Sequence, residues 1–165
     1  MTTEVRFYHL TRKTLEQALP EMLEKTVERG WRAVVMAGSA ERVEALTQML
    51  WSYSPNGFLA HGNAKDGYAE MQPIWLTERD ERPNRAEVLF LIDGASCAEA
   101  QGYQRVCELF DGNDEGAVTE ARRRWRDYVA KAGTDGEVYA LSYWQQGVSG
   151  WVDATPKATS SGGGQ

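Results

Sequence analysis

Residues 33–50, AVVMAGSAERVEALTQML, decide the fold class of this chain. They begin with five apolar residues in a row, a pattern typical of a strand that is buried on both faces of a sheet. Gly38 turns the chain, and Ser39 is a suitable N-cap for a helix whose apolar residues recur at spacings of three and four. A strand, a short turn and a helix in this order predict half of a parallel α/β unit.

Segments of the same two kinds lie on both sides of this unit. Further strands are predicted at 5–10 (VRFYHL), 73–77 (PIWLT), 87–93 (EVLFLID), 104–110 (QRVCELF) and 137–144 (EVYALSYW), and a short helix at 98–103. Another helix is predicted between the capping box of Thr14 with Gln17 and the terminating Gly30. Pro20 lies inside its pattern, so we expect either a kink there or a helix start close to it.

The length and composition suit one domain. The 165 residues are 42% hydrophobic and 25% charged, which is ordinary for a globular protein with a sizeable core. We therefore predict a single α/β, Rossmann-like domain at 1–153, with a mostly parallel sheet flanked by helices, and a disordered polar tail at 154–165. No apolar run approaches the roughly 18 residues of a membrane span, so a cytoplasmic protein is expected.

Composition also limits the partners that we expect. The formal net charge is -6 and the pI is about 5.0, whereas domains that coat nucleic acid are basic or carry a basic stripe. Contact with DNA is therefore expected only indirectly, through another protein. Cys97 and Cys107 form no metal-ligand pattern, and neither a metal nor a cofactor is expected. Six tryptophans and seven tyrosines favour a protein partner, because such side chains are enriched at interfaces.

A helix predicted at 113–133, with Asn113 as its N-cap, contains four arginines within five positions. They are Arg122, Arg123, Arg124 and Arg126. On a helical wheel of about 100° per residue, the apolar positions fall on one stripe. That predicted buried stripe consists of Val118, Ala121, Trp125, Val129 and Ala132. The arginines therefore flank a buried seam.

The two sides of that seam carry different arginines. Arg122 and Arg126 lie side by side on one shoulder, whereas Arg124 and Tyr128 lie on the other and Arg123 points into solvent. Like charges four residues apart destabilise a helix unless an anion lies between them, and arginine forks suit carboxylates. We therefore predict a pocket here for an acidic partner peptide with a hydrophobic tip.

A second candidate surface lies where the helix that begins after Ser39 runs into a long loop at 52–72. Loops of this length are usually functional or mobile. Trp51, Tyr53 and Phe58 gather at this junction. We do not expect all three to be buried in a loop-rich region, so they predict a second partner surface. If one of them belongs to the core, Trp51 at the end of the helix is the candidate.

An enzyme is the alternative class. Asp93 ends the strand at 87–93, where α/β sheets bind ligands, so its carboxylate suits a nucleotide- or metal-dependent enzyme. The companion motifs are missing, however, because neither GxGxxG nor GxxxxGK[ST] follows a predicted strand. Asp93 is otherwise expected to cap the next turn. His9 and His61 have no assignable catalytic partner, and His61 is expected at the surface or an interface.

Several segments together resemble a known family, the chi subunit of the bacterial DNA polymerase III holoenzyme. The segments are FYHL at 7–10, LWSYSPNGFLAHG at 50–62, QPIWLT at 72–77, VLFLIDGA at 88–95 and RVCELFDGNDEGAVTEARRRWRDY at 105–128. Their order and spacing carry the resemblance, which covers about residues 4–151. Val118 stands where members of the family can carry a lysine.

The resemblance implies a Rossmann-like accessory subunit of the clamp loader that neither binds nucleotides nor catalyses a reaction. It also implies that one surface binds the acidic C-terminal tail of single-stranded DNA-binding protein. The family's basic and aromatic segment for that tail corresponds to Arg122, Arg124, Trp125, Arg126 and Tyr128. A separate surface of the family binds the psi subunit or a helicase-like protein, and Trp51 and Phe58 correspond to it.

Overall fold

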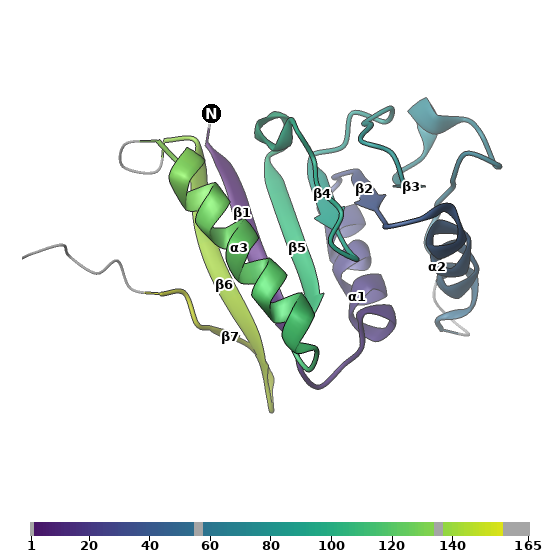
Figure 1. The fold of residues 1–165 in the computed structure, drawn as a ribbon. Coiled ribbons are helices and arrows are strands. Elements are labelled where there is room, and N and C mark those ends of the chain that lie inside the picture. Colours follow the sequence, from purple (N-terminus) through teal and green to yellow (C-terminus); the bar gives the residue numbers. More distant parts are fainter. Residues whose placement is uncertain (1, 55–57, 134–136, 157–165) are drawn as a thin grey trace, which may run out of the picture.

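The computed structural model describes residues 2–54, 58–133 and 137–156. Within those residues, one seven-stranded sheet contains β1 (Thr3–Leu10), β2 (Ala33–Met36), β3 (Ile74–Thr77), β4 (Val88–Leu91), β5 (Arg105–Asp111), β6 (Tyr139–Gly147) and β7 (Gly150–Asp153). The strand order is β3-β2-β4-β5-β1-β6-β7 (Figure 1). All neighbours are parallel except β6 and β7, which form an antiparallel hairpin. The predicted α/β class with a mostly parallel sheet is confirmed.

Helices cover both faces of this sheet. They are α1 (Leu15–Glu28), α2 (Ala40–Ser52) and α3 (Glu115–Lys131), with short 3-10 turns η1 (Ala69–Met71) and η2 (Ala100–Gly102). Helix α3 crosses one face over β5 and β6, whereas α1 packs on β2 and β5 and α2 packs on β3 from the other face (Figure 1). Helices α2 and α3 therefore lie toward opposite edges of the sheet, and the second face of β6 and β7 has no helix over it among the described residues.

The sheet divides the core into two layers. Successive residues of β1 alternate between them, because side chains of a strand point to opposite faces. Phe7 lies in the layer beneath α3, together with Val106 and Ala121. Tyr8 lies in the layer beneath α1 and α2, together with Leu23. Each strand of the sheet interior thus contributes to both layers, which explains the continuous apolar runs of β2 and β4.

The predicted starts of the first two helices are confirmed. The Thr14 hydroxyl accepts from the Gln17 backbone N–H at 3.3 Å, and the Gln17 side chain accepts from the Thr14 N–H at 3.0 Å. The Ser39 hydroxyl likewise accepts from the Arg42 N–H at 3.2 Å. Helix α1 therefore begins at Leu15, and Pro20 is a buried residue within it rather than its start.

The N-cap of α3 differs from the prediction. Asp114 is the cap, because its Oδ1 accepts from the backbone N–H groups of Gly116 at 2.9 Å and Ala117 at 3.2 Å. The side chain of Asn113 instead donates to the carbonyl oxygen of Thr11 at 3.1 Å, which ties the loop before α3 to the end of β1. Both residue types cap helices well, so local propensity does not separate them.

The buried stripe of α3 is also rotated relative to the wheel prediction. Val129 is 52% exposed, so its predicted burial is wrong. Tyr128 takes its place against the core layer, beside the buried Ala121. The physical reason lies in the sheet, because Glu108 of β5 is buried beneath the helix and pairs with Arg124. That pair turns the shoulder of Arg124 and Tyr128 toward the sheet.

Three described residues follow β7. Residues 154–156, the start of the predicted tail at 154–165, follow the strand without regular structure, and residues 157–165 lie outside the described residues. The domain boundary at 153 therefore stays a prediction. Among the described helices, none combines the length and the apolar character needed to cross a membrane.

Candidate functional site

A pocket lies between α3 and the ends of β1 and β6. Its cavity is about 480 Å³. The helix contributes Arg122, Trp125 and Arg126, three of the five side chains that the sequence grouped. The remaining lining residues are His9, Tyr143, Gln145, Ala154 and Pro156. The pocket thus joins two exposed guanidinium groups, one helical turn apart, to an aromatic wall.

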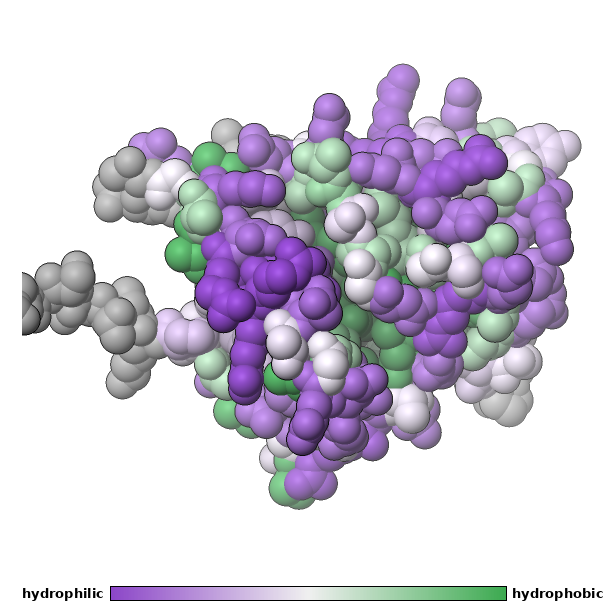
Figure 2. All heavy atoms as spheres, in the orientation of Figure 1, coloured by the Kyte–Doolittle hydropathy of each residue, from purple (hydrophilic) through white to green (hydrophobic). Residues whose placement is uncertain are grey.

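The two pocket arginines carry uncompensated charge. Among the described residues, the ion pairs of α3 belong to Arg123 and Arg124, and none belongs to Arg122 or Arg126. Figure 2 shows strongly hydrophilic side chains gathered over α3. In a chain whose net charge is -6, these two guanidinium groups form a local positive site that favours an anion. An anionic ligand that brings a carboxylate meets that requirement.

The aromatic wall of the pocket is fixed by packing. The Trp125 ring lies edge-on to Phe7, with ring centroids 5.2 Å apart, and to Tyr143, at 5.9 Å. Edge-to-face contacts of this kind hold aromatic rings in one orientation. A hydrophobic ligand group therefore meets a wall that is already in place.

His9 and Tyr143 form the part of the site that sequence reasoning missed. The His9 Nδ1 and the Tyr143 hydroxyl share a hydrogen bond of 2.6 Å. Burial lowers the pKa of His9, and the positive charge of Arg122 lowers it further, although a hydrogen bond to the Gly112 backbone opposes them. Burial raises the pKa of Tyr143, which keeps its hydroxyl protonated. The site therefore contains a largely neutral imidazole beside its cations.

Two features of the structure explain why His9 lies at this site. β1 and β6 pair in parallel with His9 opposite Gln145, so both reach the same end of the sheet. The turn after β5 has a glycine, Gly112, at which a Cβ atom would overlap the His9 ring and lie 2.8 Å from the Leu10 carbonyl oxygen. A glycine at that position leaves room for the imidazole. Neither signal is readable without the strand order.

Arg124 and Tyr128 lie elsewhere. Arg124 donates from Nε to Glu108 at 2.5 Å, and these side chains are 11% and 1% exposed. The Tyr128 hydroxyl lies 3.5 Å from the other Glu108 oxygen, and its ring is edge-on to Phe7 at 5.8 Å. Burial raises the pKa of Glu108, and the Arg124 charge offsets part of that rise. Both residues therefore attach α3 to the sheet and do not line the pocket.

Arg123 lies outside, as predicted, and pairs with acidic side chains of its own helix at 3.1 and 3.2 Å.

The second candidate surface lies at the end of α2. Phe58 is 75% exposed and Trp51 is 50% exposed, so Trp51 is not the aromatic of the three that belongs to the core. Tyr53 is instead the aromatic that packs on the core, and its hydroxyl hydrogen-bonds to Glu24. The Trp51 ring lies 4.2 Å from the ring of His61 and 6.1 Å from that of Phe58. Trp51 and Phe58 thus form an exposed aromatic pair.

His61, expected at the surface, is buried beneath this pair. Its Nδ1 lies 2.6 Å from the Leu59 carbonyl oxygen, and its Nε2 lies 3.0 Å from the Thr47 carbonyl oxygen. The ring therefore joins the loop after α2 to the helix itself. Because the Trp51 ring lies against it, His61 supports the exposed aromatic pair from below.

Asp93 belongs to an ion-pair network. Its carboxylate accepts from Arg42 at 3.0 Å instead of capping the following turn, and Arg42 also pairs with Glu16 at 2.7 Å. The network borders a cavity of about 470 Å³ at the carboxyl ends of β1 and β5. The three successive backbone N–H groups at 11–13 in this loop all donate to the Gln146 side-chain oxygen, at 2.8 to 3.0 Å. These three backbone N–H groups, which are of the kind that binds phosphate, are engaged by the protein itself.

Comparison with known proteins identifies the family. The sequence model of the family described as DNA polymerase III chi subunit, HolC, matches residues 1–135. The chain belongs to the DNA polymerase III chi subunit family. A relative from Rickettsia prowazekii (strain Madrid E), named "Probable DNA polymerase III subunit chi", is 27% identical over 103 residues. That alignment covers 62% of this chain and 62% of the relative, so the chain spans less than two thirds of the relative's length.

The family match includes α3 but ends before β6. Arg122, Trp125 and Arg126 therefore lie within the part of the chain that the chi family shares. Tyr143 and Gln145, which complete the pocket, lie beyond residue 135. Membership in the chi family relates the chain to DNA replication and to the polymerase III replicase.

Proposed function

We propose that this chi-family protein is a non-catalytic accessory subunit of the replicase clamp-loader complex, and that its α3 pocket binds the acidic C-terminal tail of single-stranded DNA-binding protein. The observation that carries the proposal is the pair of guanidinium groups of Arg122 and Arg126 beside the Trp125 ring. These arginines have no ion-pair partner among the described residues. They offer forked donors to a carboxylate, which is the geometry that arginine recognises best.

The combination of groups that line the pocket supports a peptide end as the ligand. A terminal carboxylate and a hydrophobic side chain on the same residue need cations and an apolar wall within one small cavity. Arg122 and Arg126 supply the cations, and Trp125 with Tyr143 supplies the wall. Arg124 and Tyr128, which the family resemblance also relates to the tail, have in this proposal the role of holding the helix on the sheet.

A second partner fits the other aromatic surface. Trp51 and Phe58 lie at the end of α2, at the β3 edge of the sheet, whereas the α3 pocket lies toward the β6 edge (Figure 1). We propose that this pair contacts the psi subunit of the clamp loader or a helicase-like protein. Exposed aromatic side chains are the residue type that most often dominates binding energy at interfaces. Partners on opposite edges do not exclude one another, which is what a bridging subunit requires.

Calorimetry with a synthetic acidic peptide that ends in phenylalanine tests the pocket. Arg122→Ala removes one of the two uncompensated cations and is expected to weaken binding by about 1.5–3 kcal/mol, the range for a charged hydrogen bond. That loss corresponds to a factor of about 10 to 100 in Kd. The affinity of the unmodified protein should also fall as salt is added, because charges attract the peptide.

Arg123→Ala is the matched control. It removes the same charge from the same helix, but Arg123 lies outside the pocket and pairs with Glu120 and Asp127. Its affinity should stay close to that of the unmodified protein. Equal weakening in both variants would indicate only a general charge effect, and unchanged affinity in Arg122→Ala would reject the pocket.

A further inference from the structure

A groove lies on the face of the sheet opposite α3, between α1 and the β6–β7 hairpin. Its cavity is about 510 Å³, and it shares no lining residue with the α3 pocket. The groove exists because α1 packs over β2 and β5 and leaves this face of β6 and β7 without a helix from the described part of the chain. Tyr8 and Phe90 of the sheet form part of its floor. It is therefore a separate concave surface on the second face of the molecule.

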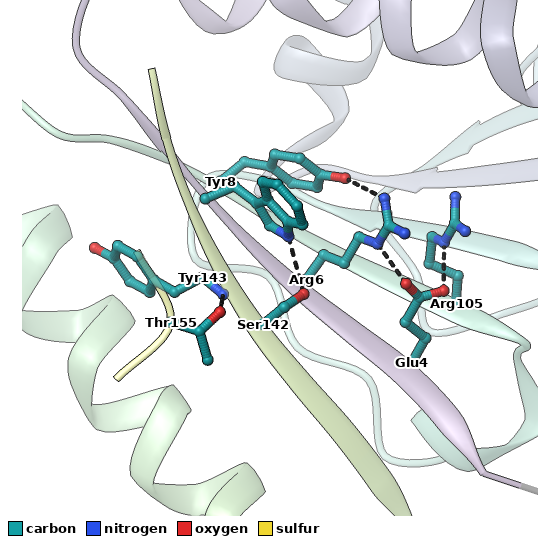
Figure 3. Close-up of polar contacts among 8 residues, drawn as sticks. Glu4, Arg6, Tyr8, Arg105, Ser142, Tyr143 and Thr155 are labelled. Carbon is teal, nitrogen blue, oxygen red and sulfur yellow. Dashed lines mark hydrogen bonds and ion pairs between the residues drawn. The ribbon is translucent and has the colours of Figure 1, made fainter. Parts of the chain in front are cut away.

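The groove is basic in an acidic protein. Four cationic residues line it, Arg6, Lys25, Arg29 and Arg105, against the single carboxylate of Glu28. Figure 3 shows Arg6 and Arg105 on either side of the Glu4 carboxylate, which accepts from them at 2.6 and 2.9 Å. Glu4 therefore fixes two of the guanidinium groups and neutralises one charge. Even with Glu4 counted, the cations outnumber the carboxylates by four to two, whereas the whole chain has a net charge of -6.

The remaining two cations have no such partner. Lys25 and Arg29 are exposed, one turn apart at the end of α1, and make no ion pair with any described residue. The guanidinium carbon of Arg29 lies 3.9 Å from the centre of the Trp31 ring, which holds the side chain beside the groove. The helix dipole favours cations at this C-terminal end of α1, and an anion between the two side chains would relieve their mutual repulsion.

Two tryptophans on the hairpin form the opposite wall. Trp144 donates from Nε1 to the Ser142 hydroxyl at 2.9 Å, and the guanidinium carbon of Arg6 lies 5.8 Å from its ring centre. Trp151 lies edge-on to Tyr8, with ring centroids 5.0 Å apart. Both tryptophans line the cavity and are only partly buried. Each indole is thus held in place while part of it remains accessible to a ligand.

We propose that this groove binds a short stretch of single-stranded nucleic acid. Phosphate groups would contact Lys25 and Arg29, and bases would stack on Trp144 and Trp151. Single-strand binding sites combine these elements, a positively charged groove that follows the backbone and aromatic side chains that accept bases. The proposal departs from the sequence-based expectation that contact with DNA is only indirect. That expectation missed the groove because its cations are dispersed in the sequence and meet only in the fold.

The observations favour a nucleic acid over an acidic peptide. Lys25 and Arg29 lie on the α1 wall, Arg6 and Arg105 lie on the sheet between the walls, and the indoles lie on the hairpin wall. Positive charge across the groove with two indoles along one side suits a chain that repeats a charge and a flat ring in every unit. The α3 pocket differs, because its two cations are adjacent on one helix and lie beside a single aromatic wall. The two sites lie on different faces of the sheet and share no residue, so each is testable without the other.

Fluorescence anisotropy of a labelled oligothymidylate of about 12 nucleotides, with the full-length protein at about 50 mM salt, tests the proposal. Lys25→Ala/Arg29→Ala should weaken binding at least about tenfold and lower the salt dependence, by about one unit of slope for each phosphate group that the variant no longer binds. Trp151→Ala should weaken it by about five- to hundredfold, the range for one stacked base. Trp151→Phe should restore most of that affinity.

Arg122→Ala/Arg126→Ala is the matched control, since it removes two charges from the opposite face of the sheet. It should bind the oligonucleotide normally and fail to bind the acidic peptide. Lys25→Ala/Arg29→Ala should bind the acidic peptide normally and bind the oligonucleotide more weakly. Thermal unfolding of each variant checks that the fold is intact. No anisotropy change with the unmodified protein, or equal affinity in Lys25→Ala/Arg29→Ala, would overturn the proposal. It would also be overturned if a labelled acidic peptide, and not the oligonucleotide, bound more weakly to that variant.

Discussion

The four arginines of α3 have three different environments within five positions of one helix. Arg122 and Arg126 line a pocket, Arg123 pairs with acidic side chains in solvent, and Arg124 is buried against Glu108. Their residue type is the same, so each role follows from what the fold places next to the side chain. The expected effects of substitution therefore differ in kind.

Arg124→Ala is expected to destabilise the protein by about 3–5 kcal/mol, because it leaves the buried Glu108 carboxylate without a counter-charge. Arg123→Ala, one position away, is expected to change stability by no more than about 1 kcal/mol, as is usual for exposed pairs. Urea denaturation followed by circular dichroism measures both. Similar losses in the two variants would contradict the structural role of Arg124.

The loss in Arg124→Ala should depend on pH. Burial already raises the pKa of Glu108 in the folded protein, and removing Arg124 removes the charge that opposes that rise. A carboxyl group with a raised pKa stabilises the fold below its ordinary pKa, and this contribution disappears as pH rises through the folded value. The difference in unfolding free energy between Arg124→Ala and the unmodified protein should thus be smaller at pH 5 than at pH 8. A difference that is constant over this range would contradict the assignment.

His9 reports on Arg122. Burial and the Arg122 charge lower the pKa of His9, so the folded state favours the neutral imidazole, and stability falls as pH drops below the ordinary histidine value of 6.5. Arg122→Ala should raise the pKa of His9, whereas Arg123→Ala should leave it unchanged. A proton NMR titration of the imidazole signals measures this, with His9→Asn identifying the signal. Identical titration curves in both variants would show that the Arg122 charge does not affect the pKa of His9.

At the scale of elements, α3 shows how a helix is positioned by its ends and by one buried pair. Its start is fixed by Asp114, whose carboxylate accepts from two backbone N–H groups of the first turn. Its rotation is fixed by Arg124 on Glu108, which turns Tyr128 inward and Val129 outward. Together these contacts place Arg122 and Arg126 over the ends of β1 and β6.

The cap is testable against its neighbour. Asp114→Ala should destabilise the protein by about 1 kcal/mol, the usual loss for an N-cap. Asn113→Ala should have a smaller effect, because it removes an exposed hydrogen bond to the Thr11 carbonyl and not the cap. Thermal denaturation of the two variants gives the comparison. A larger loss of stability in Asn113→Ala than in Asp114→Ala would indicate that Asn113, the cap predicted from the sequence, is the N-cap.

At the scale of the whole molecule, the parallel sheet separates the candidate surfaces. The Trp51–Phe58 pair lies near β3 at one edge, and the α3 pocket lies near β6 toward the other (Figure 1). The basic groove lies on a different face of the sheet from the pocket. The molecule therefore has three separate candidate surfaces, which the sheet and its two core layers connect.

Binding at the two edges should be independent. Trp51→Ala should leave the affinity for the acidic peptide within about twofold, since substitutions at sites without shared contacts usually add within about 0.5 kcal/mol. In pull-downs with the full-length protein, Trp51→Ala and Arg122→Ala should each fail to retain a different partner. Calorimetry of Trp51→Ala gives the quantitative check. A tenfold loss of peptide affinity there would show that the surfaces are coupled.

Local patterns in the sequence were sufficient for the fold class. The apolar run and Ser39 cap of 33–50, and the capping box at Thr14, depend only on residues close in the chain, and the structure confirms them. The sequence also contains one signal for the rotation of α3. A glutamate, Glu108, interrupts the apolar strand QRVCELF, and a charge in such a run requires a buried partner.

Tertiary structure alone decided the environment of the functional side chains. A helical wheel identifies an apolar stripe but not which shoulder faces the sheet, and that choice was made by Glu108, from another element. The pocket and the groove both need β6 beside β1, a pairing across more than 130 residues that no local pattern encodes. The sequence by itself therefore determined the family, the three helices and strands β1 to β6, but not β7, because propensity and periodicity are local. The contents of each site depended on strand order and helix rotation, because those arise from contacts between residues far apart in the chain.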